Sequence, residues 1–288
     1  MAAHGPATPA TAGAGTAPAA PDASVPGAAV GFPRDEPVNV QQMGPYAFDK
    51  YSDGLDNPTY TSSIMYYPTD APPPFAIVLF SPAFTVTMAE YEQYLGPLLA
   101  THGIAILLTT PTTTSDVPTL RGDDLEAALM QIQAENSREG SPLKGKIATD
   151  RVCVSGHSMG GGGSLWAANK LGDKLKCAVP LQPWQPGQRF DKVTAATLFI
   201  AAEADNVAGV SSNARFFYDS IPQTVPKYYV EFAGASHYLT TNTLGEHYDV
   251  QSRYMVAFYK RFLEDDKRYQ EVLDAPGDAV LSEYEHMP

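Results

Sequence analysis

Short, almost continuous apolar segments alternate along this chain with segments whose apolar residues recur every three or four positions. The continuous segments are short and rich in β-branched and aromatic residues, which predicts buried strands. They lie at residues 60–67, 75–81, 104–109, 152–154, 177–181, 197–202 and 228–232. The last of them is expected to be the final strand.

Helices are predicted between these strands. One begins near Met88 and ends at Gly103, a residue type that is common just after a helix. A second has Leu125 and Leu129 on its apolar face, and others are expected after residue 158 and at about 212–220 and 249–263. The alternation predicts an α/β fold with a mostly parallel, doubly wound sheet that helices cover on both faces. Ligands bind such sheets beyond the carboxyl ends of the strands.

The same pattern predicts the domain organisation. Residues 1–35 consist mostly of Ala, Pro, Gly and Thr without hydrophobic periodicity, so we expect a disordered linker, similar to one that remains after removal of a leader. Residues 36–273 are expected to form one α/β domain, and the charged residues 274–288 a loosely packed tail. Only 15 residues separate Leu181 from Thr197, which leaves no room for a cap domain.

The net charge of the chain limits the classes of molecule that it can bind. It has 19 basic and 32 acidic side chains, a formal net charge of −13. Nucleic acid is excluded as a partner because its phosphates require a basic face. No apolar run approaches the roughly 20 residues that span a bilayer. We expect a monomer with no metal ion and no organic cofactor.

The two cysteines, Cys153 and Cys177, fall in two predicted strands. We interpret them as small buried thiols, with a disulfide between neighbouring strands as the alternative. Their spacing does not match that of a zinc site.

The candidate nucleophile lies within residues 151–166, RVCVSGHSMGGGGSLW. Ser158 is the centre of G-x-S-x-G, with a predicted strand before it and a predicted helix after it. In that setting the motif predicts a nucleophile elbow, a strained turn that holds the serine above the sheet. Gly156 and Gly160 allow the close backbone approach that such a turn needs. A dinucleotide-binding loop is excluded because the G-x-G-x-x-G spacing is not matched.

A nucleophilic serine needs a base and an acid that orients the base, and in a fold of this kind they follow in the order serine, acid, histidine. Asp205 comes just after the strand at 197–202, and His237 after the strand at 228–232. Both should therefore lie at the same sheet edge as Ser158. Glu203 is the alternative acid and His247 the alternative base, each placed less favourably after its strand.

Two backbone N–H groups should bind the oxyanion of a tetrahedral intermediate. One belongs to Met159, the residue after the nucleophile, at the start of its helix. The other is expected in the loop after residues 75–81, where SPAFT places Phe84. Trp184, between two prolines beyond a strand end, is expected at the rim of the site. His157 is expected to pack away from the serine.

These residues lie in motifs that resemble those of the cutinase-like bacterial polyester hydrolases, which include PET hydrolases. The motifs are GHSMGGGGSLWAAN, LQPWQP, AAEADNVAGV, GASHYLTTN and FYKRFLEDDKRY, within about residues 44–273. The family consists of lidless α/β-hydrolases related to the dienelactone hydrolases. The resemblance implies that fold without a cap, the triad Ser158, Asp205 and His237, and oxyanion donors at Phe84 and Met159.

The resemblance also implies the lining of the substrate groove. Trp184 would stack on a substrate ring, Val207 would line the opposite side, and Tyr238 takes the place of a family phenylalanine. Ala83 stands where glycine is common and Gly209 where proline is usual, and the C-terminal disulfide of many members is missing. Some members bind calcium at surface acids; we interpret the acidic pairs here, at residues 123–124 and 265–266, as solvated faces.

The implied activity is that of a secreted serine ester hydrolase. It would act on cutin-like or aromatic polyesters through an acyl-enzyme, in an open groove that also includes the Phe84 side chain. One alternative is a carboxylesterase or lipase for small molecules without polymer activity, because the triad would be identical. The other is a non-catalytic binding protein that has kept the fold.

Overall fold

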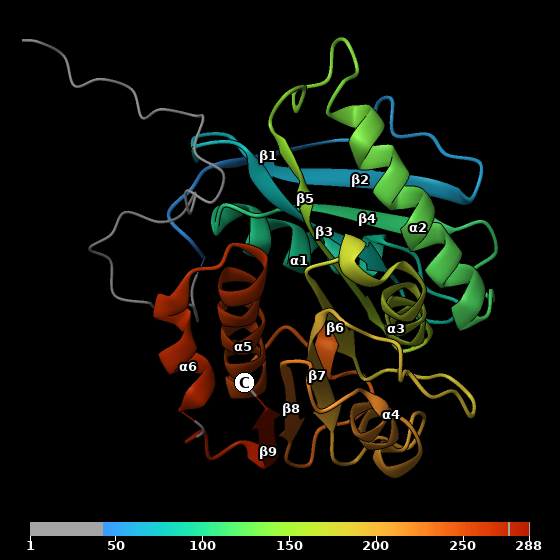
Figure 1. Cartoon of the computed structure of the whole chain (residues 1–288), viewed down its shortest axis with the longest axis vertical. Coiled ribbons are helices and arrows are strands. Elements are labelled where there is room, and N and C mark those ends of the chain that lie inside the picture. Colours follow the sequence, from blue (N-terminus) through green and yellow to red (C-terminus); the bar gives the residue numbers. More distant parts are fainter. Residues whose placement is uncertain (1–42, 276, 288) are drawn as a thin grey trace, which may run out of the picture.

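The computed structural model describes residues 43–275 and 277–287, and the linker predicted for residues 1–35 lies outside them. Strands of the described residues form one nine-stranded sheet in the order β1-β2-β4-β3-β5-β6-β7-β8-β9 (Figure 1). The strands are β1 (Phe48–Tyr51), β2 (Tyr60–Pro68), β3 (Phe75–Ser81), β4 (Ala105–Pro111), β5 (Ile147–His157), β6 (Cys177–Leu181), β7 (Ala196–Ala202), β8 (Lys227–Phe232) and β9 (Leu281–Met287).

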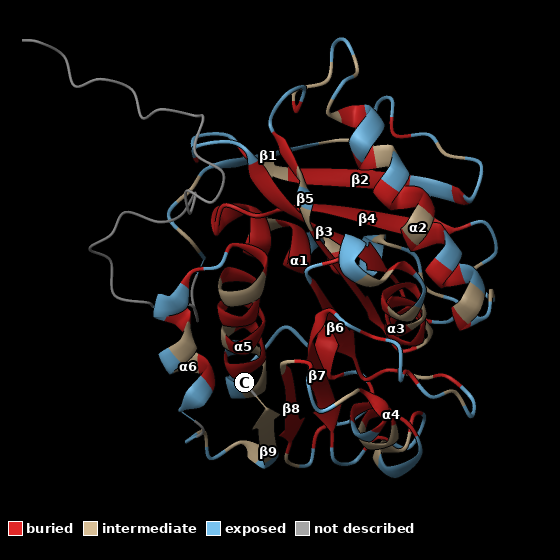
Figure 2. Ribbon diagram, viewed as in Figure 1, coloured by how far each residue is buried: buried red, intermediate tan, exposed pale blue. Residues whose placement is uncertain are grey.

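The centre of the sheet is parallel. β4, β3, β5, β6, β7 and β8 run in the same direction. At one edge β2 pairs antiparallel with β4 and β1 pairs antiparallel with β2, and at the other edge β9 pairs antiparallel with β8. Every residue of β3, β4, β7 and β8 is buried, as Figure 2 shows in red. Burial on both faces of the sheet explains why these strands appear in the sequence as mostly apolar runs.

Helices cover both faces of this sheet. They are α1 (Ala89–Thr101), α2 (Pro118–Glu135), α3 (Met159–Leu171), α4 (Ala214–Ser220), α5 (Glu246–Leu263) and the short α6 (Gln270–Asp274). Residues of α1 and α5 share one hydrophobic cluster with one face of the sheet, and residues of α2, α3 and α4 share a second cluster with the other face (Figure 1). Residues 182–195, between β6 and β7, contain no helix or strand. This is the α/β-hydrolase architecture, and the described segments between the strands build no cap over it.

The interpretation of Cys153 and Cys177 as free thiols is wrong, because the structure joins them in a disulfide. Cys153 and Cys177 are direct neighbours in the parallel pairing of β5 with β6, and their Cα atoms are 4.6 Å apart. That separation is within the range that a disulfide spans. The bond therefore links the strand that leads to Ser158 with the strand that leads to Trp184.

The prediction of a loosely packed tail is also wrong. Residues 281–287 form β9, which pairs with β8 over most of its length, and the N–H of Ala233 donates to the C=O of Val280. β9 is exposed or half-buried along its whole length, and most of its residues are polar. The chain therefore continues the sheet beyond β8, and β8 is not its last strand.

Candidate active site

Ser158 occupies a sharp turn between β5 and α3. Its backbone has φ 56° and ψ −116°, a conformation that residues with a side chain rarely adopt. The Ser158 N–H donates to the C=O of Leu181, and the Ser158 C=O accepts from the N–H groups of Gly162 and Trp184, each over 2.9 Å. These bonds to α3 and to the segment after β6 hold the strained backbone in place.

Glycine is required on both sides of this turn. A Cβ atom on Gly156 would collide with the backbone of Gly160 and of Ser81. One on Gly160 would collide with the carbonyl groups of Ser81 and Pro82. The N-terminus of α3 and the loop after β3 are thus in direct backbone contact, which brings the two segments expected to bind the oxyanion together.

Ser158, His237 and Asp205 form a hydrogen-bonded row. The Ser158 hydroxyl donates to Nε2 of His237 over 2.8 Å, and Nδ1–H of His237 donates to Oδ2 of Asp205 over 2.7 Å. The three residues follow β5, β8 and β7, so the carboxyl ends of three parallel strands supply them. All three are at least nine-tenths buried, which strengthens the electrostatic coupling between them.

Asp205 is held in its ionised form. Its burial opposes ionisation, but hydrogen bonds from His237, Ala208 and Val207 outweigh that penalty and keep the pKa of Asp205 below its usual range. The N–H groups of Val207 and Ala208 donate to Oδ1 over 2.9 and 2.7 Å. The carboxylate is therefore fixed on one side by the chain and on the other by the imidazole.

The two alternative residues lie outside this row. The exposed side chain of Glu203 accepts the N–H of Gly234 over 2.8 Å and so supports the turn after β8. The ring of His247 packs against Phe232, with ring centroids 5.7 Å apart. Both groups have structural contacts that account for their positions.

Hydrogen bonds to three other residues hold the loop that contains Phe84. The N–H of Ala83 donates to the hydroxyl of Tyr91 over 3.2 Å, and Nη1 of Arg121 donates to the C=O of Pro82 over 2.9 Å. Thr85, with φ 60°, donates its N–H to Thr114. Phe84 itself is 46% exposed, so its side chain is free to contact a ligand while its backbone is held.

Three other expected ligand contacts surround the triad. Trp184 is half-buried, and its backbone N–H donates a hydrogen bond to the C=O of Ser158. Val207 and Tyr238 are 52% and 62% exposed, and each lies within two residues of a triad member. Val207 and Tyr238 thus expose large side chains next to triad residues, which suits a ligand-binding rim.

Arg121 was not predicted from the sequence as part of this site. This side chain is fully buried and donates to the backbone carbonyls of Pro82, Thr114 and Asp116. It lies on the apolar face of α2, one turn before Leu125. A basic residue on an otherwise apolar helix face is the signal that could have revealed it.

The interpretation of the acidic pairs as solvated is wrong for one member of each. Asp124 and Asp266 are buried, whereas Asp123 is exposed and forms an ion pair with Lys170 over 2.9 Å. Asp266 accepts the N–H of Arg268 over 3.1 Å. Among the residues that the structure describes, no three His, Cys, Asp or Glu side chains gather as a set of metal ligands.

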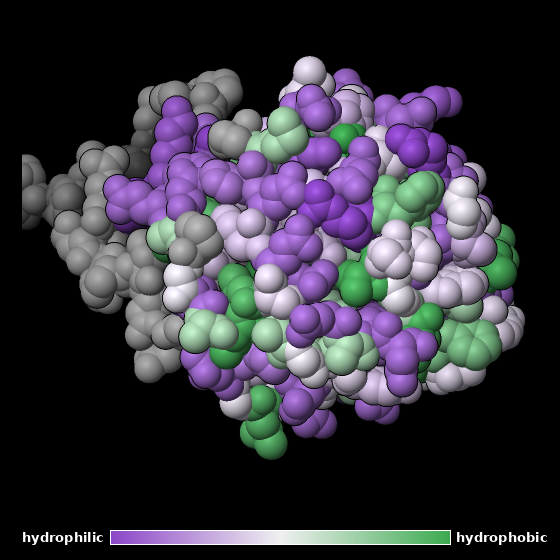
Figure 3. Space-filling model, turned by 90° about the horizontal axis from the view of Figure 1, so that it is seen from below, coloured by the Kyte–Doolittle hydropathy of each residue, from purple (hydrophilic) through white to green (hydrophobic). Residues whose placement is uncertain are grey.

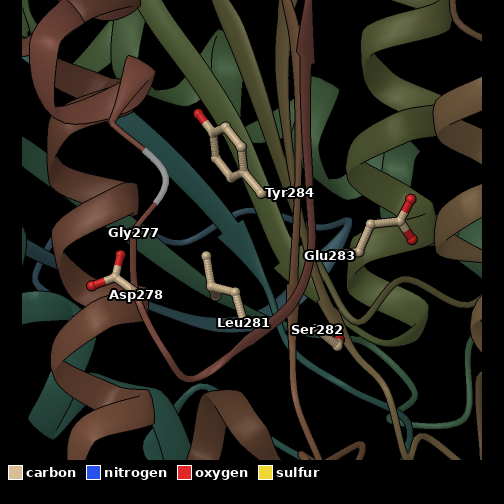
Figure 4. Close-up of a pocket in the computed structure, with 6 residues that line it drawn as sticks. All are labelled: Gly277, Asp278, Leu281, Ser282, Glu283 and Tyr284. Atoms are coloured by element: carbon tan, nitrogen blue, oxygen red, sulfur yellow. The ribbon is translucent and has the colours of Figure 1, made fainter.

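A small hollow beside β9 is separate from the triad (Figure 4). It is lined by Gly277, Asp278, Leu281, Ser282, Glu283 and Tyr284. Asp278 is paired there with Arg253 of α5, so this charge is already neutralised within the chain.

Known proteins similar to this chain include several cutinases. Residues 37–287 match the model of the PET hydrolase-like family. Cutinase 1 of Thermobifida cellulosilytica is 36% identical over 225 residues, which cover 77% of this chain and 81% of that protein. The cutinase of Thermobifida fusca (strain YX) is 36% identical over 77% of this chain and 70% of its own length. A bis(hydroxyethyl) terephthalate hydrolase of Streptomyces coelicolor is 35% identical over 234 residues, 80% of this chain and 71% of that protein.

Proposed function

The chain belongs to the PET hydrolase-like family, and we propose that it is a serine hydrolase that cleaves carboxylic esters, polyesters among them, through an acyl-enzyme. The observation that carries this proposal is the hydrogen-bonded row of Ser158, His237 and Asp205 at the carboxyl edge of the sheet. The names of its relatives, cutinases and a bis(hydroxyethyl) terephthalate hydrolase, support ester substrates of polymeric or aromatic kind.

In the first half-reaction, Oγ of Ser158 attacks the ester carbonyl carbon while Nε2 of His237 takes the hydroxyl proton. The carbonyl oxygen becomes an oxyanion, which the N–H groups of Phe84 and Met159 stabilise. The C–O bond to the leaving alcohol then breaks, and His237 returns the proton to that oxygen. The product is an ester of Ser158 with the acid part of the substrate.

Water completes the cycle. His237 takes a proton from the water as it attacks the acyl-enzyme carbonyl, and a second tetrahedral intermediate forms in the same oxyanion site. Its collapse releases the carboxylic acid, and the proton on His237 returns to Oγ of Ser158. In both halves Asp205 stabilises the charged imidazolium and fixes its orientation, which its lowered pKa allows.

The substrate lies between Trp184 and Val207, with Phe84 and Tyr238 beside the scissile bond. Aromatic rings stack on indole faces, so a terephthalate unit fits this lining as well as an aliphatic acyl chain does. The connection between β6 and β7 leaves the site without a cap. An uncovered site can accept the middle of a polymer chain.

We also propose that the protein works outside the cell as a monomer. A disulfide such as Cys153–Cys177 persists in oxidising compartments. None of the helices in the described part of the chain is long and apolar enough to cross a membrane.

The direct test compares a soluble p-nitrophenyl ester with an amorphous polyester film. The wild-type protein is expected to hydrolyse both and to release soluble monomers from the film, whereas the Ser158→Ala variant releases neither product. Hydrolysis of the soluble ester alone would identify a small-molecule esterase and contradict the polyester substrate. Absence of both activities in the folded wild-type protein would favour a binding protein.

A further inference from the structure

His157, the residue before the nucleophile, contacts the backbone of the catalytic histidine. Its Nε2 is 2.8 Å from the backbone oxygen of His237, and its Nδ1 is 2.8 Å from the hydroxyl oxygen of Tyr91 in α1. That hydroxyl oxygen is in turn 3.2 Å from the backbone nitrogen of Ala83. The loop after β3, helix α1, the end of β5 and the loop after β8 therefore meet through two side chains.

The contacts from Ala83 through Tyr91 and His157 to His237 form a second hydrogen-bonded row. One arrangement of protons satisfies all of them with a neutral His157 imidazole. The carbonyl of His237 can only accept, so Nε2 of His157 carries the proton. Nδ1 of His157 is then an acceptor, and the Tyr91 hydroxyl donates to it. The same hydroxyl oxygen accepts the N–H of Ala83. The row thus runs in a single direction from Ala83 to His237.

The surroundings keep His157 neutral. His157 is 2% exposed and Tyr91 is fully buried. Burial, together with the nearby His237 ring, lowers the pKa of His157 to about 3. The ring of Tyr91 packs on Phe80, with ring centroids 4.8 Å apart. His157 therefore keeps its single proton at Nε2 throughout the neutral pH range.

We propose that His157 and Tyr91 are positioning residues of the ester hydrolase site, which fix the His237 loop and the Phe84 loop relative to Ser158. The inference rests on the proposed function. His157 is bonded covalently to Ser158, so its hydrogen bonds tie the base and the oxyanion loop to the nucleophile itself. Neither side chain contacts the triad side chains through a hydrogen bond. Displacing a catalytic group by about 1 Å can cost roughly 10²-fold in rate.

Two substitutions of His157 separate hydrogen bonding from packing. His157→Phe keeps a planar ring but removes the donor to the His237 carbonyl. His157→Gln keeps an amide N–H near the position of Nε2. On a soluble p-nitrophenyl ester, we expect His157→Phe to lower kcat by roughly 10- to 100-fold with KM unchanged. His157→Gln should recover about tenfold of that loss.

Tyr91→Phe tests the other end of the row with the ring packing kept. It removes the donor to His157 and the acceptor for Ala83, so kcat should fall by about tenfold, again with KM unchanged. The matched control is Tyr254→Phe, because Tyr254 is fully buried and its hydroxyl bonds Asp278 over 3.1 Å, among the C-terminal elements. It should lower the unfolding temperature similarly and leave kcat unchanged.

The outcomes distinguish this inference from the proposed function. An inactive wild-type protein overturns the proposed function and the positioning role with it. An active wild-type protein with unimpaired kcat in both His157→Phe and Tyr91→Phe overturns the positioning role alone. Equal losses of kcat in His157→Phe and His157→Gln, or a matching loss in Tyr254→Phe, would assign the effect to packing and also overturn it.

Discussion

Ser158 combines a strained backbone with a buried, hydrogen-bonded side chain. Strain of this kind costs on the order of 1–3 kcal/mol and persists only where the surroundings fix the conformation. Here the bonds from Gly162 and Trp184 to the Ser158 carbonyl supply that constraint. The turn is thus stabilised by the segment that also places the Trp184 side chain, so the proposed nucleophile and the proposed groove wall are positioned together.

Asp205→Asn is predicted to lower kcat by about 10⁴-fold. An asparagine amide cannot stabilise the imidazolium and can donate to Nδ1 of His237, which favours the wrong tautomer. The measurement is steady-state hydrolysis of a p-nitrophenyl ester, with Glu203→Gln as the matched control. Glu203 supports only a surface turn, so its variant should keep near-normal kcat. A large loss of kcat in Glu203→Gln with near-normal kcat in Asp205→Asn would identify Glu203 as the catalytic acid.

The triad could be predicted from the sequence because each member follows a strand whose burial is visible in the apolar pattern. Asp205 and His237 come three and five residues after the last residues of β7 and β8, Ala202 and Phe232, by the numbering. The hydrogen-bonding roles of His157 and Tyr91 could not be predicted. They depend on α1 lying against the end of β5, and the two partners are 66 positions apart in the sequence.

At the level of elements, the disulfide connects β5 to β6 below the nucleophile. It closes a loop across a sequence separation of 24. The double variant Cys153→Ala/Cys177→Ala is predicted to lose about 2–4 kcal/mol of unfolding free energy. Urea unfolding of the oxidised protein and the variant measures this. An unchanged midpoint would show that the disulfide does not stabilise the fold.

Asp124 in helix α2 is expected to make the stability of the protein depend on pH. Burial, with a contribution from Asp116, raises the pKa of Asp124 to about 7, and its Oδ2 has no hydrogen-bond partner among the described residues. The folded state then binds a proton that the unfolded chain releases above about pH 4. The contribution of this carboxyl group to stability therefore falls as pH rises from about 4 to 7, the range between the two pKa values.

Asp124→Asn should remove this slope, since an amide does not titrate. The expected result is that the unfolding midpoint of the variant changes less than that of the wild type between pH 4 and 8. Asp123→Asn, one position away and exposed, serves as the control and should leave the slope intact. Identical slopes in the wild type and Asp124→Asn would rule out titration of this carboxyl.

The edge strands β1 and β9 could not be predicted from the sequence. A run of apolar residues indicates a strand only where both faces of that strand are buried. β1 and β9 are exposed or half-buried along most of their length, and their sequences FDKY and LSEYEHM contain too few apolar residues for the signal. Main-chain pairing with β2 and β8 makes them strands. That pairing does not depend on side-chain hydrophobicity.

At the scale of the whole molecule, the fold is a single sheet whose two edges are covered by polar strands. The face of the molecule in Figure 3 shows hydrophobic residues in small groups among polar ones. The parallel centre and the absence of a cap were predictable from strand spacing. The order of the strands was not, because it depends on long-range packing between the layers.

A chain that ends after Asp274 tests the role of β9 in this architecture. Removing β9 uncovers the edge of β8, whose unpaired backbone groups can then pair with another copy of the protein. The truncated protein is predicted to unfold at a temperature at least about 4 °C lower and to form larger species in size-exclusion chromatography. Unchanged melting and a monomeric profile would make β9 dispensable.

Covalent labelling with a fluorophosphonate, followed by peptide mass mapping, tests directly whether Ser158 is the nucleophile. A triad-activated serine displaces fluoride and becomes phosphonylated. We expect one adduct, on Ser158, with ester hydrolysis lost in proportion to labelling and neither labelling nor hydrolysis in Ser158→Ala. An adduct on another residue, or undiminished ester hydrolysis by Ser158→Ala, would contradict it.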